Sequence, residues 1–378
     1  MIKGYVIRLY PTKEQEHMMW DHVDAARYIW NYMRELQETR HDNGEKHLSA
    51  FDMINLLKPL KSDGNHDWLY DVSNATLQMS CRDLDEAYKR FFKKTAGYPR
   101  FKSRKKDEPR FPVRGETIWF SGKGVKVERL GFVKFKTDFE LPYGRDAKFS
   151  NPRIKYVLGK WYLSFGMECE NQAPVLTDKA MGIDLGVKDL AIAAFGDEQI
   201  VFHNINKSKQ VRDLKKHIKH TQRSISRKYE ANRVGRKFVK TNNIIREEEK
   251  LRRLNARLAN IRKNYIHQTT AALIKMLPCR VTMEDLNVSG MMKNRHLSRV
   301  IQEQCLAEFV RQMQYKCEFN GIEFVQVGRF YPSSKTCSGC GSIKKDLKLK
   351  DRTYICPVCG LVIDRDYNAA INLMRYVA

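Results

Sequence analysis

The chain has 378 residues, of which 42% are hydrophobic and 11% aromatic. This length and composition exclude a disordered tail and suggest two or three globular domains, at the usual ~100–200 residues each. The 69 Lys and Arg outnumber the 44 Asp and Glu. A net charge of +25 is far more than solubility requires, so a large polyanion is the expected partner.

The sequence lacks export and membrane signals. No run of about 18 apolar residues occurs, and residues 1–11 contain no apolar stretch of signal-peptide length. We therefore expect a soluble protein located in the cytoplasm, with no membrane partner. Five further cysteines are isolated in the sequence, and we expect them to be ordinary core residues with free thiols in a reducing compartment. These are Cys81, Cys169, Cys279, Cys305 and Cys317.

The first part of the chain predicts one strand, then helices, then several strands. Residues 2–10 alternate in polarity, and a Thr12-x-x-Gln15 start signal follows Pro11. Apolar residues then recur every three or four positions over 13–94. Short runs of period two predict later strands at 124–128, 132–136, 153–157 and 161–168. We expect these strands to form a small barrel that residues 2–10 complete, with the helices inserted.

From residue 180 the pattern is typical of an α/β domain. Apolar strands are predicted at 181–185, 190–195, 280–286 and 322–327. They alternate with helical stretches at 205–277, 298–318 and 367–376. A cysteine-rich insert at 337–359 interrupts this domain. The predicted fold class is therefore an α+β multidomain protein.

Four cysteines form two close pairs, Cys337-x2-Cys340 and Cys356-x2-Cys359, separated by 15 residues. This spacing is typical of a four-thiolate zinc ribbon. Four soft ligands in tetrahedral geometry leave no open position for a substrate. The sequence thus predicts one structural Zn²⁺ ion.

Acidic residues lie at the ends of apolar segments: Asp184, Glu284, and Asp364 or Asp366. A buried acid costs several kcal/mol unless it is paired or bound to a metal, so three of them in one domain suggest convergence on a cation. Hard oxygen ligands select Mg²⁺ or Mn²⁺. Two such ions about 4 Å apart support in-line phosphodiester hydrolysis.

Spacing helps to choose between neighbouring acids. Asp366 shares a helical face with Ala369 and Leu373, so we expect it to point inward and Asp364 to cap the helix. Strand alternation favours Glu284 over Asp285, although a strand buried on both faces leaves that choice open.

Basic residues are concentrated in two regions. Residues 204–263 contain 20 Lys or Arg against 5 Asp or Glu, a net charge of +15, on a predicted helix pair with one apolar stripe. Such a one-signed surface indicates nucleic-acid binding. A second cluster spans residues 89–106 and includes Tyr98 and Phe101, a mixture of cations and rings suited to RNA or single strands.

With these features the sequence resembles TnpB, the family of transposon-encoded RNA-guided nucleases related to the type V CRISPR effectors. The matching segments span nearly the whole chain. They are RLYPTKEQ, ARYIWN, GYPRFKSRKK, GIDLGVKDLA, MEDLNV, YPSSKTCSGCG, YICPVCG and DRDYNAAINL.

The resemblance implies a helical recognition domain (13–95) inserted in a wedge β-barrel (1–12 and 96–178). A ribonuclease H-like RuvC nuclease domain (179–335 and 361–378) follows, interrupted by a zinc-ribbon target-nucleic-acid-binding insert (336–360). It also implies a catalytic triad of Asp184, Glu284 and Asp366, which would hold two Mg²⁺ ions. The implied guide is omega RNA, and the implied target is double-stranded DNA beside a short adjacent motif. We expect a monomer on its RNA.

Two other functions remain open from the sequence. A guided DNA-binding repressor would need the basic helices and the zinc ribbon but not the three acids. A strand-transfer transposase would recognise transposon ends without RNA.

Overall fold

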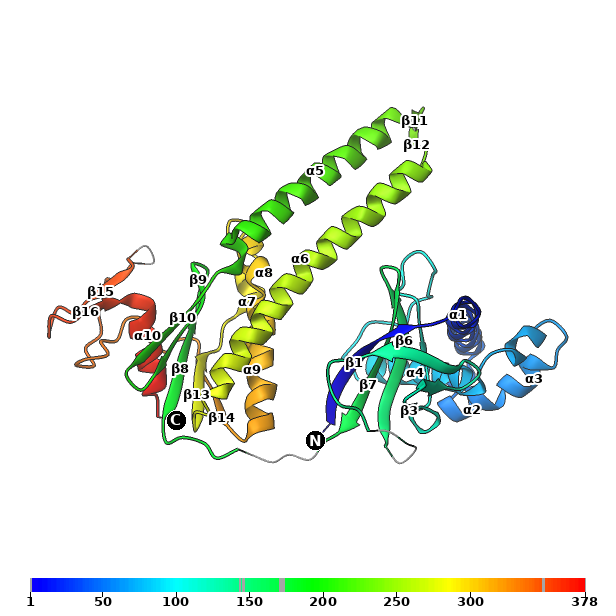
Figure 1. The fold of residues 1–378 in the computed structure, drawn as a ribbon, viewed down its shortest axis with the longest axis horizontal. Helices are drawn as coiled ribbons and strands as arrows, with labels where there is room; N and C mark the ends of the chain where they lie inside the picture. The colour runs from blue at the N-terminus through cyan, green and yellow to red at the C-terminus, as the bar shows by residue number, and fades with distance from the viewer. Residues whose placement is uncertain (1, 143, 145–146, 170–173, 349–350, 378) are drawn as a thin grey trace. The chain divides into compact units, whose positions relative to one another are not determined.

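The computed structural model describes residues 2–142, 144, 147–169, 174–348 and 351–377. The chain divides into two compact units, residues 1–170 and 171–378 (Figure 1). Among the described residues, no helix combines the length and the apolar character needed to cross a membrane.

The first unit begins with a strand and continues with the predicted helices, which are α1 (Lys13–Asp42), α2 (Ala50–Asn55), α3 (Leu57–Lys61) and α4 (Asn74–Phe92). A capping box starts α1, as predicted. The Thr12 hydroxyl accepts from the N–H of Gln15, and the Gln15 side chain accepts from the N–H of Thr12. Met33, Met53 and Leu77 are fully buried between these helices, so the helical segment has a core of its own.

Within the described residues, seven strands of this unit pair in the order β2-β6-β7-β1-β5-β4-β3. They are β1 (Ile2–Tyr10), β2 (Arg110–Pro112), β3 (Trp119–Ser121), β4 (Gly124–Val127), β5 (Gly131–Lys136), β6 (Phe149–Val157) and β7 (Lys160–Glu168). Strand β1 lies between β5 and β7, which confirms that the first strand joins the later ones. The sheet is a curled half-barrel rather than a fully closed barrel. Strand β2 is an edge, and its Pro112 has no N–H with which to extend the ladder.

The second unit is built on a mixed sheet whose described strands follow the order β10-β9-β8-β13-β14. They are β8 (Ala180–Leu185), β9 (Asp189–Phe195), β10 (Glu198–His203), β13 (Arg280–Glu284) and β14 (Glu323–Val327). Strands β8, β13 and β14 are parallel. The strand predicted at 280–286 ends at Glu284, because the chain turns there and the N–H of Leu286 bonds to the Glu284 carbonyl.

The helices of this unit are α5 (Lys209–Ala231), α6 (Asn242–Lys275), α7 (Val288–Met291), α8 (Ser298–Gln304), α9 (Leu306–Asn320) and α10 (Arg365–Met374). Among them, α6 and α9 pack on one face of the sheet and α10 packs on the other. Leu273 of α6 and Phe309 of α9 are buried in one core with Ile183 of β8. On the other face, Ala370 of α10 packs with Ile192 of β9. A predicted helix over 298–318 is broken at Cys305, whose φ of 53° is left-handed.

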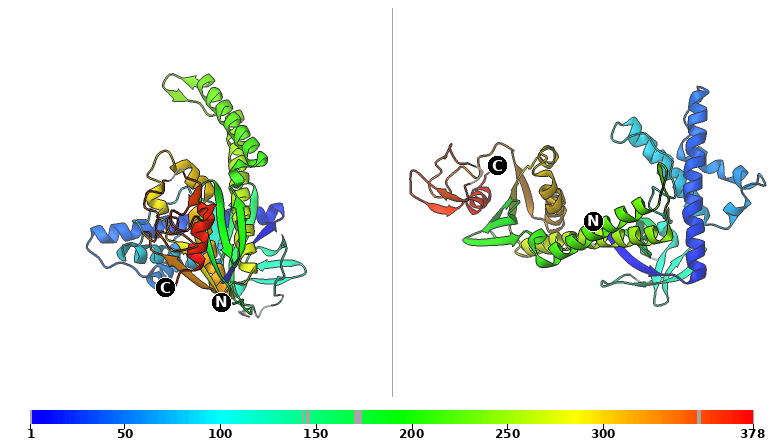
Figure 2. Two further views of the ribbon diagram at one scale, coloured as in Figure 1. Left: turned by 90° about the vertical axis from the view of Figure 1, so that its left-hand side faces the viewer. Right: turned by 90° about the horizontal axis from the view of Figure 1, so that it is seen from above.

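Helices α5 and α6 run side by side as a long hairpin (Figures 1 and 2). A two-stranded tip, β11 (Arg233–Val234) and β12 (Lys237–Phe238), joins them. A further two-stranded sheet, β15 (Thr353–Ile355) and β16 (Val362–Asp364), belongs to the cysteine-rich segment before α10.

Candidate metal centres and basic surfaces

Asp184 and Glu284 lie at the carboxyl ends of neighbouring parallel strands. Ile183 of β8 is in register with Met283 of β13, and both side chains are buried in the core under α6 and α9. Because successive side chains in a strand point to opposite faces, Asp184 and Glu284 lie on the other face, which α10 covers. Each is partly buried.

The neighbouring acid Asp285 has different surroundings. The Nε of Arg329 donates to its Oδ2 at 2.8 Å, and its side chain is 43% exposed. The side chains of Glu284 and Asp285 therefore lie in different environments, and Glu284 is the one on the same face of the sheet as Asp184.

Helix α10 brings in the third acid. Asp364 caps the helix as predicted, because its Oδ1 accepts from the N–H of Asp366 at 2.9 Å and of Tyr367 at 3.1 Å. That cap leaves Asp366 in the first helical turn, where it forms an ion pair of 2.9 Å with Arg365.

The three acids act on one another electrostatically. The pKa of Asp184 is raised well above its ordinary value, first by burial and then by the negative charges of Glu284 and Asp366, while Arg365 opposes the rise. Among the described residues, their carboxylate oxygens do not form a group as tight as the cysteine cluster described next, in which all ligand atoms lie within 4.8 Å of one another. The three acids thus share one electrostatic neighbourhood.

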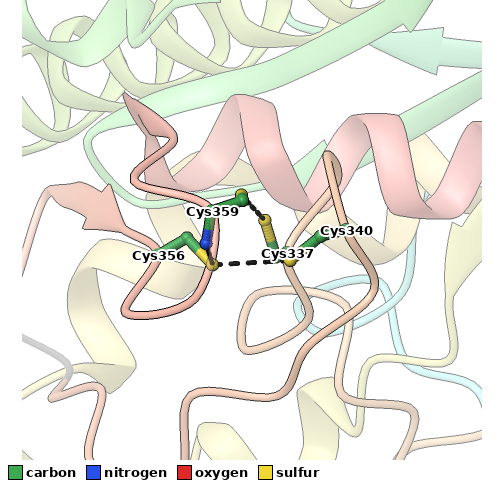
Figure 3. A group of neighbouring side chains, drawn as sticks. All are labelled: Cys337, Cys340, Cys356 and Cys359. Atoms are coloured by element: carbon green, nitrogen blue, oxygen red, sulfur yellow. Dashed lines mark hydrogen bonds between the residues drawn. The ribbon is translucent and has the colours of Figure 1, made fainter.

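The predicted cysteine pairs come together (Figure 3). The sulfur atoms of Cys337 and Cys359 are 3.6 Å apart, as are those of Cys340 and Cys356. Four thiolates at about 2.3 Å from a tetrahedral Zn²⁺ would stand about 3.8 Å from one another, so the cluster fits this ion. Its four ligands would close the coordination shell, which suits a structural role.

Contacts to α10 hold this cysteine segment in place. The buried side chain of Asn368 accepts from the N–H of Ser338 at 2.9 Å and donates to the Thr336 carbonyl at 2.7 Å. One turn later, Asn372 donates to the carbonyls of Ser333 and Thr336, each at 2.7 Å. Neither asparagine was predicted from the sequence, although two Asn four positions apart in DRDYNAAINL mark one face of a helix.

The Ser333 side chain was also missed. It is 1% exposed, and its hydroxyl donates to Oε1 of Glu284. Two adjacent serines shortly before the first cysteine pair were the available signal, but nothing local distinguishes Ser333 from Ser334.

The α5–α6 hairpin has the apolar stripe and basic faces that were predicted. Leu214, Ile218 and Leu258 are buried between the helices. An exposed surface of α5 is lined by Lys219, His220, Gln222, Arg223, Ser226 and Arg227. Only part of the charge is neutralised internally. For example, Lys215 pairs with Glu303 at 2.6 Å.

The second basic cluster is fixed against α1. Trp30 donates from its indole to the Arg100 carbonyl at 3.0 Å, and the Asn31 side chain bonds both the N–H and the C=O of Lys102. The guanidinium of Arg34 lies 3.8 Å from the centre of the Phe101 ring. Because Phe101 is still 48% exposed, it retains surface that a base could contact.

Three family models match successive segments of the chain. Residues 1–46 match the family described as "Helix-turn-helix domain", residues 164–295 "Probable transposase", and residues 307–373 "Cas12f1-like, TNB domain". In the solved structure of the mini-RNA-guided endonuclease CRISPR-Cas_phi3, the match covers 99% of this chain and 92% of that one, with a TM-score of 0.50 and 11% identity. That likeness concerns the fold alone.

Two curated relatives match almost end to end. "Putative RNA-guided DNA endonuclease InsQ" of Escherichia coli (strain K12) is 30% identical, over 99% of this chain and 92% of that protein. "Putative RNA-guided DNA endonuclease" of Streptomyces pristinaespiralis is 28% identical, over 98% and 88%. On this full-length similarity, the chain belongs to the TnpB family, whose members include proteins named as RNA-guided DNA endonucleases.

Proposed function

We propose that this chain is an RNA-guided endonuclease that uses a transposon-derived omega RNA to find double-stranded DNA beside a short adjacent motif, and that it hydrolyses phosphodiesters there. The observation that supports the proposal is that Glu284 and Asp366 lie close enough to Asp184 to act on it electrostatically. The three acids come from two strands and a helix far apart in the sequence, and Glu284 and Asp366 raise the pKa of Asp184. Like charges gathered at a partly buried site are costly, and clusters of this kind are typical of functional sites.

The three carboxylates are the proposed ligands of two catalytic Mg²⁺ ions. Their donor set fits, because hard oxygen ligands of one charge sign suit this cation. When bound, such ions activate water and stabilise the departing oxygen in phosphodiester hydrolysis. The secondary structure of the chain orients these three carboxylates. Strands β8 and β13 fix Asp184 and Glu284 at adjacent positions, and the Asp364 cap fixes the first turn of α10 that carries Asp366.

The remaining parts of the chain are assigned by the same proposal. Residues 13–95 would be the recognition domain, 1–12 and 96–178 the wedge domain, and 179–335 with 361–378 the RuvC domain. Residues 336–360 would form the zinc-holding insert that contacts target DNA. The basic faces of α5 and α6 support binding of the guide RNA, and one copy of the chain on one RNA would suffice.

The test is cleavage of a plasmid that carries a matched target and the adjacent motif, by purified protein with its RNA in the presence of Mg²⁺. We expect Asp184→Asn, Glu284→Gln and Asp366→Asn to reduce cleavage to background while target binding is retained. Asp285→Asn is the matched control, and we expect it to cut like the unmodified protein.

Each alternative predicts a different result. Tight target binding by the unmodified complex without any cleavage would support a guided repressor. Target recognition that survives removal of the RNA by ribonuclease, together with joined products, would support a transposase. Equal cleavage by Asp184→Asn would refute the acidic centre.

A further inference from the structure

The carboxylate of Glu284 is held by a residue from the segment that leads into the cysteine cluster. Ser333 is buried, and its hydroxyl donates to Oε1 of Glu284. A carboxylate that accepts a hydrogen bond from a hydroxyl at one oxygen keeps its orientation, while its remaining lone pairs are available to a cation. Ser333 does not itself need to touch the cation to have this effect.

The position of Ser333 is in turn set by α10. The Asn372 amide donates to the Ser333 carbonyl and to the Thr336 carbonyl, both at 2.7 Å, and its side chain is also buried. A buried amide that bridges two carbonyls of the same segment restricts the path of the backbone between them.

The same network reaches the first cysteine pair. Asn368 bonds the carbonyl of Thr336 and the N–H of Ser338, which are the residues on either side of Cys337. Arg375 donates to the Ser338 carbonyl as well. Hydrogen bonds therefore connect the backbone around Cys337, through two asparagines of α10, to the backbone of Ser333, whose own hydroxyl bonds the carboxylate of Glu284.

We infer that Ser333 is a positioning residue through which the zinc-binding segment sets the affinity of the acidic centre for its divalent cation. The inference rests on the proposed function, since it takes Glu284 as a ligand. Folding of the cysteine cluster around Zn²⁺ fixes Cys337 and its neighbours, α10 transmits that position, and Ser333 orients Glu284. Loss of an orienting hydrogen bond typically weakens metal affinity about 10–100-fold.

The primary experiment measures Mn²⁺ binding to the RNA-loaded protein by electron paramagnetic resonance titration, independently of cleavage. We expect Ser333→Ala to weaken Mn²⁺ affinity about 10-fold or more, with zinc content and RNA affinity unchanged. Ser333→Thr retains the hydroxyl and should restore most of the affinity. Ser334→Ala is the matched control, because Ser334 is adjacent and takes no part in this network, and it should bind Mn²⁺ like the unmodified protein.

A second variant covers the case in which Ser333→Ala does not fold. Asn372→Ala removes the two bonds that hold the Ser333 segment but leaves the hydroxyl in place, so a smaller loss of Mn²⁺ affinity is expected. Removing zinc with a chelator should weaken Mn²⁺ binding in the unmodified protein. In Ser333→Ala, zinc removal should cause little further loss of Mn²⁺ affinity, because the substitution and the chelator interrupt the same network of contacts.

The outcomes separate the inference from the proposed function. If Glu284→Gln binds Mn²⁺ as tightly as the unmodified protein, the acidic centre itself is wrong. If Glu284→Gln loses affinity while Ser333→Ala matches Ser334→Ala, only the positioning role is overturned. The positioning role is also overturned if the losses of Mn²⁺ affinity caused by chelation and by Ser333→Ala are additive. It is likewise overturned if Ser333→Ala lowers zinc content and RNA affinity together with Mn²⁺ affinity.

Discussion

A Cβ atom built on Gly182 of β8 would lie 2.0 Å from the carbonyl oxygen of Ala370 in α10, and 2.2 Å from the backbone nitrogen of Met374. Helix α10 therefore approaches the sheet more closely than any residue with a side chain would allow. Gly182 precedes Asp184 by two positions, on the same face of β8. This close approach is what brings the first turn of α10, with Asp366, to the ends of β8 and β13.

Gly182→Ala should consequently destabilise the second unit and displace α10. The clash is with backbone atoms, which cannot rotate away, so we expect a cost at or above the ~1–3 kcal/mol typical of overpacking. Thermal denaturation measures it. Gly328→Ala is the control, because its Cβ would meet nothing within 4 Å. Equal melting temperatures for the two variants would contradict the close approach.

The buried ring of His22 predicts a pH dependence of the first unit. Its Nδ1 lies 2.7 Å from the Met18 carbonyl and its Nε2 accepts from the N–H of Ser73, so the ring is neutral. Burial lowers the pKa of His22. Below about pH 6.5 the unfolded chain takes up a proton that the folded ring resists, so stability is full above that pH and falls as the pH drops.

Chemical denaturation between pH 7.5 and 5.5 measures this effect, which should reach at most about 1.4 kcal/mol per pH unit. His22→Gln should be less stable at pH 7.5 and show a shallower pH dependence. His17→Gln, at an exposed position of the same helix, should keep the dependence of the unmodified protein. Identical slopes for all three would show that His22 is not the group responsible.

Cys337→Ser removes one of the four ligands of the cysteine cluster. We expect a lower zinc content and faster proteolysis within residues 336–360, since zinc binding supplies local folding energy. DNA cleavage should fall more than RNA affinity. Cys279→Ser is the control, because Cys279 lies outside the cluster. An equal loss of RNA affinity and cleavage would show that the insert does not act separately.

Charge reversal on α5 tests the basic hairpin. Arg223→Glu and Arg227→Glu alter exposed positions and should weaken binding to the guide RNA. The slope of log affinity against log salt concentration should fall by about 1 for each phosphate that the variant no longer neutralises. Arg223→Lys keeps the charge and should retain the slope. Unchanged RNA affinity in both reversals would place the RNA elsewhere.

Local patterns predicted the elements whose signals are themselves local. The Thr12 capping box, the alternation in β7 and the apolar stripe of α5 are each contained in a few consecutive residues, and the structure has all three. The break at Cys305 was missed, because a left-handed residue between two helices leaves the three-to-four periodicity nearly intact. Strand β10 was missed because it is an edge strand with little apolar periodicity.

The residues of the candidate site likewise fall into those that local patterns predict and those that only the fold brings together. Cysteine spacing identified a cluster that forms within one short segment. Asp364 and Asp366 could be separated because helical capping depends on neighbours two and three residues away. The choice between Glu284 and Asp285 required knowing which helices cover each face of β13. Ser333 could not be found at all, since its partner lies 49 residues away and only the fold joins them.

The basic hairpin and the three acids of the second unit follow one another along the chain in a fixed order, and this order determines when each is synthesised. The ribosome produces the basic α5–α6 hairpin before Glu284, and Asp366 arrives last of the three acids. Chains begin to fold from the N-terminus during translation. Under the proposed assignment, the nascent protein could therefore bind RNA before its DNA-cleaving centre is complete. Under that assignment, the acidic centre is completed only after the basic hairpin has been synthesised.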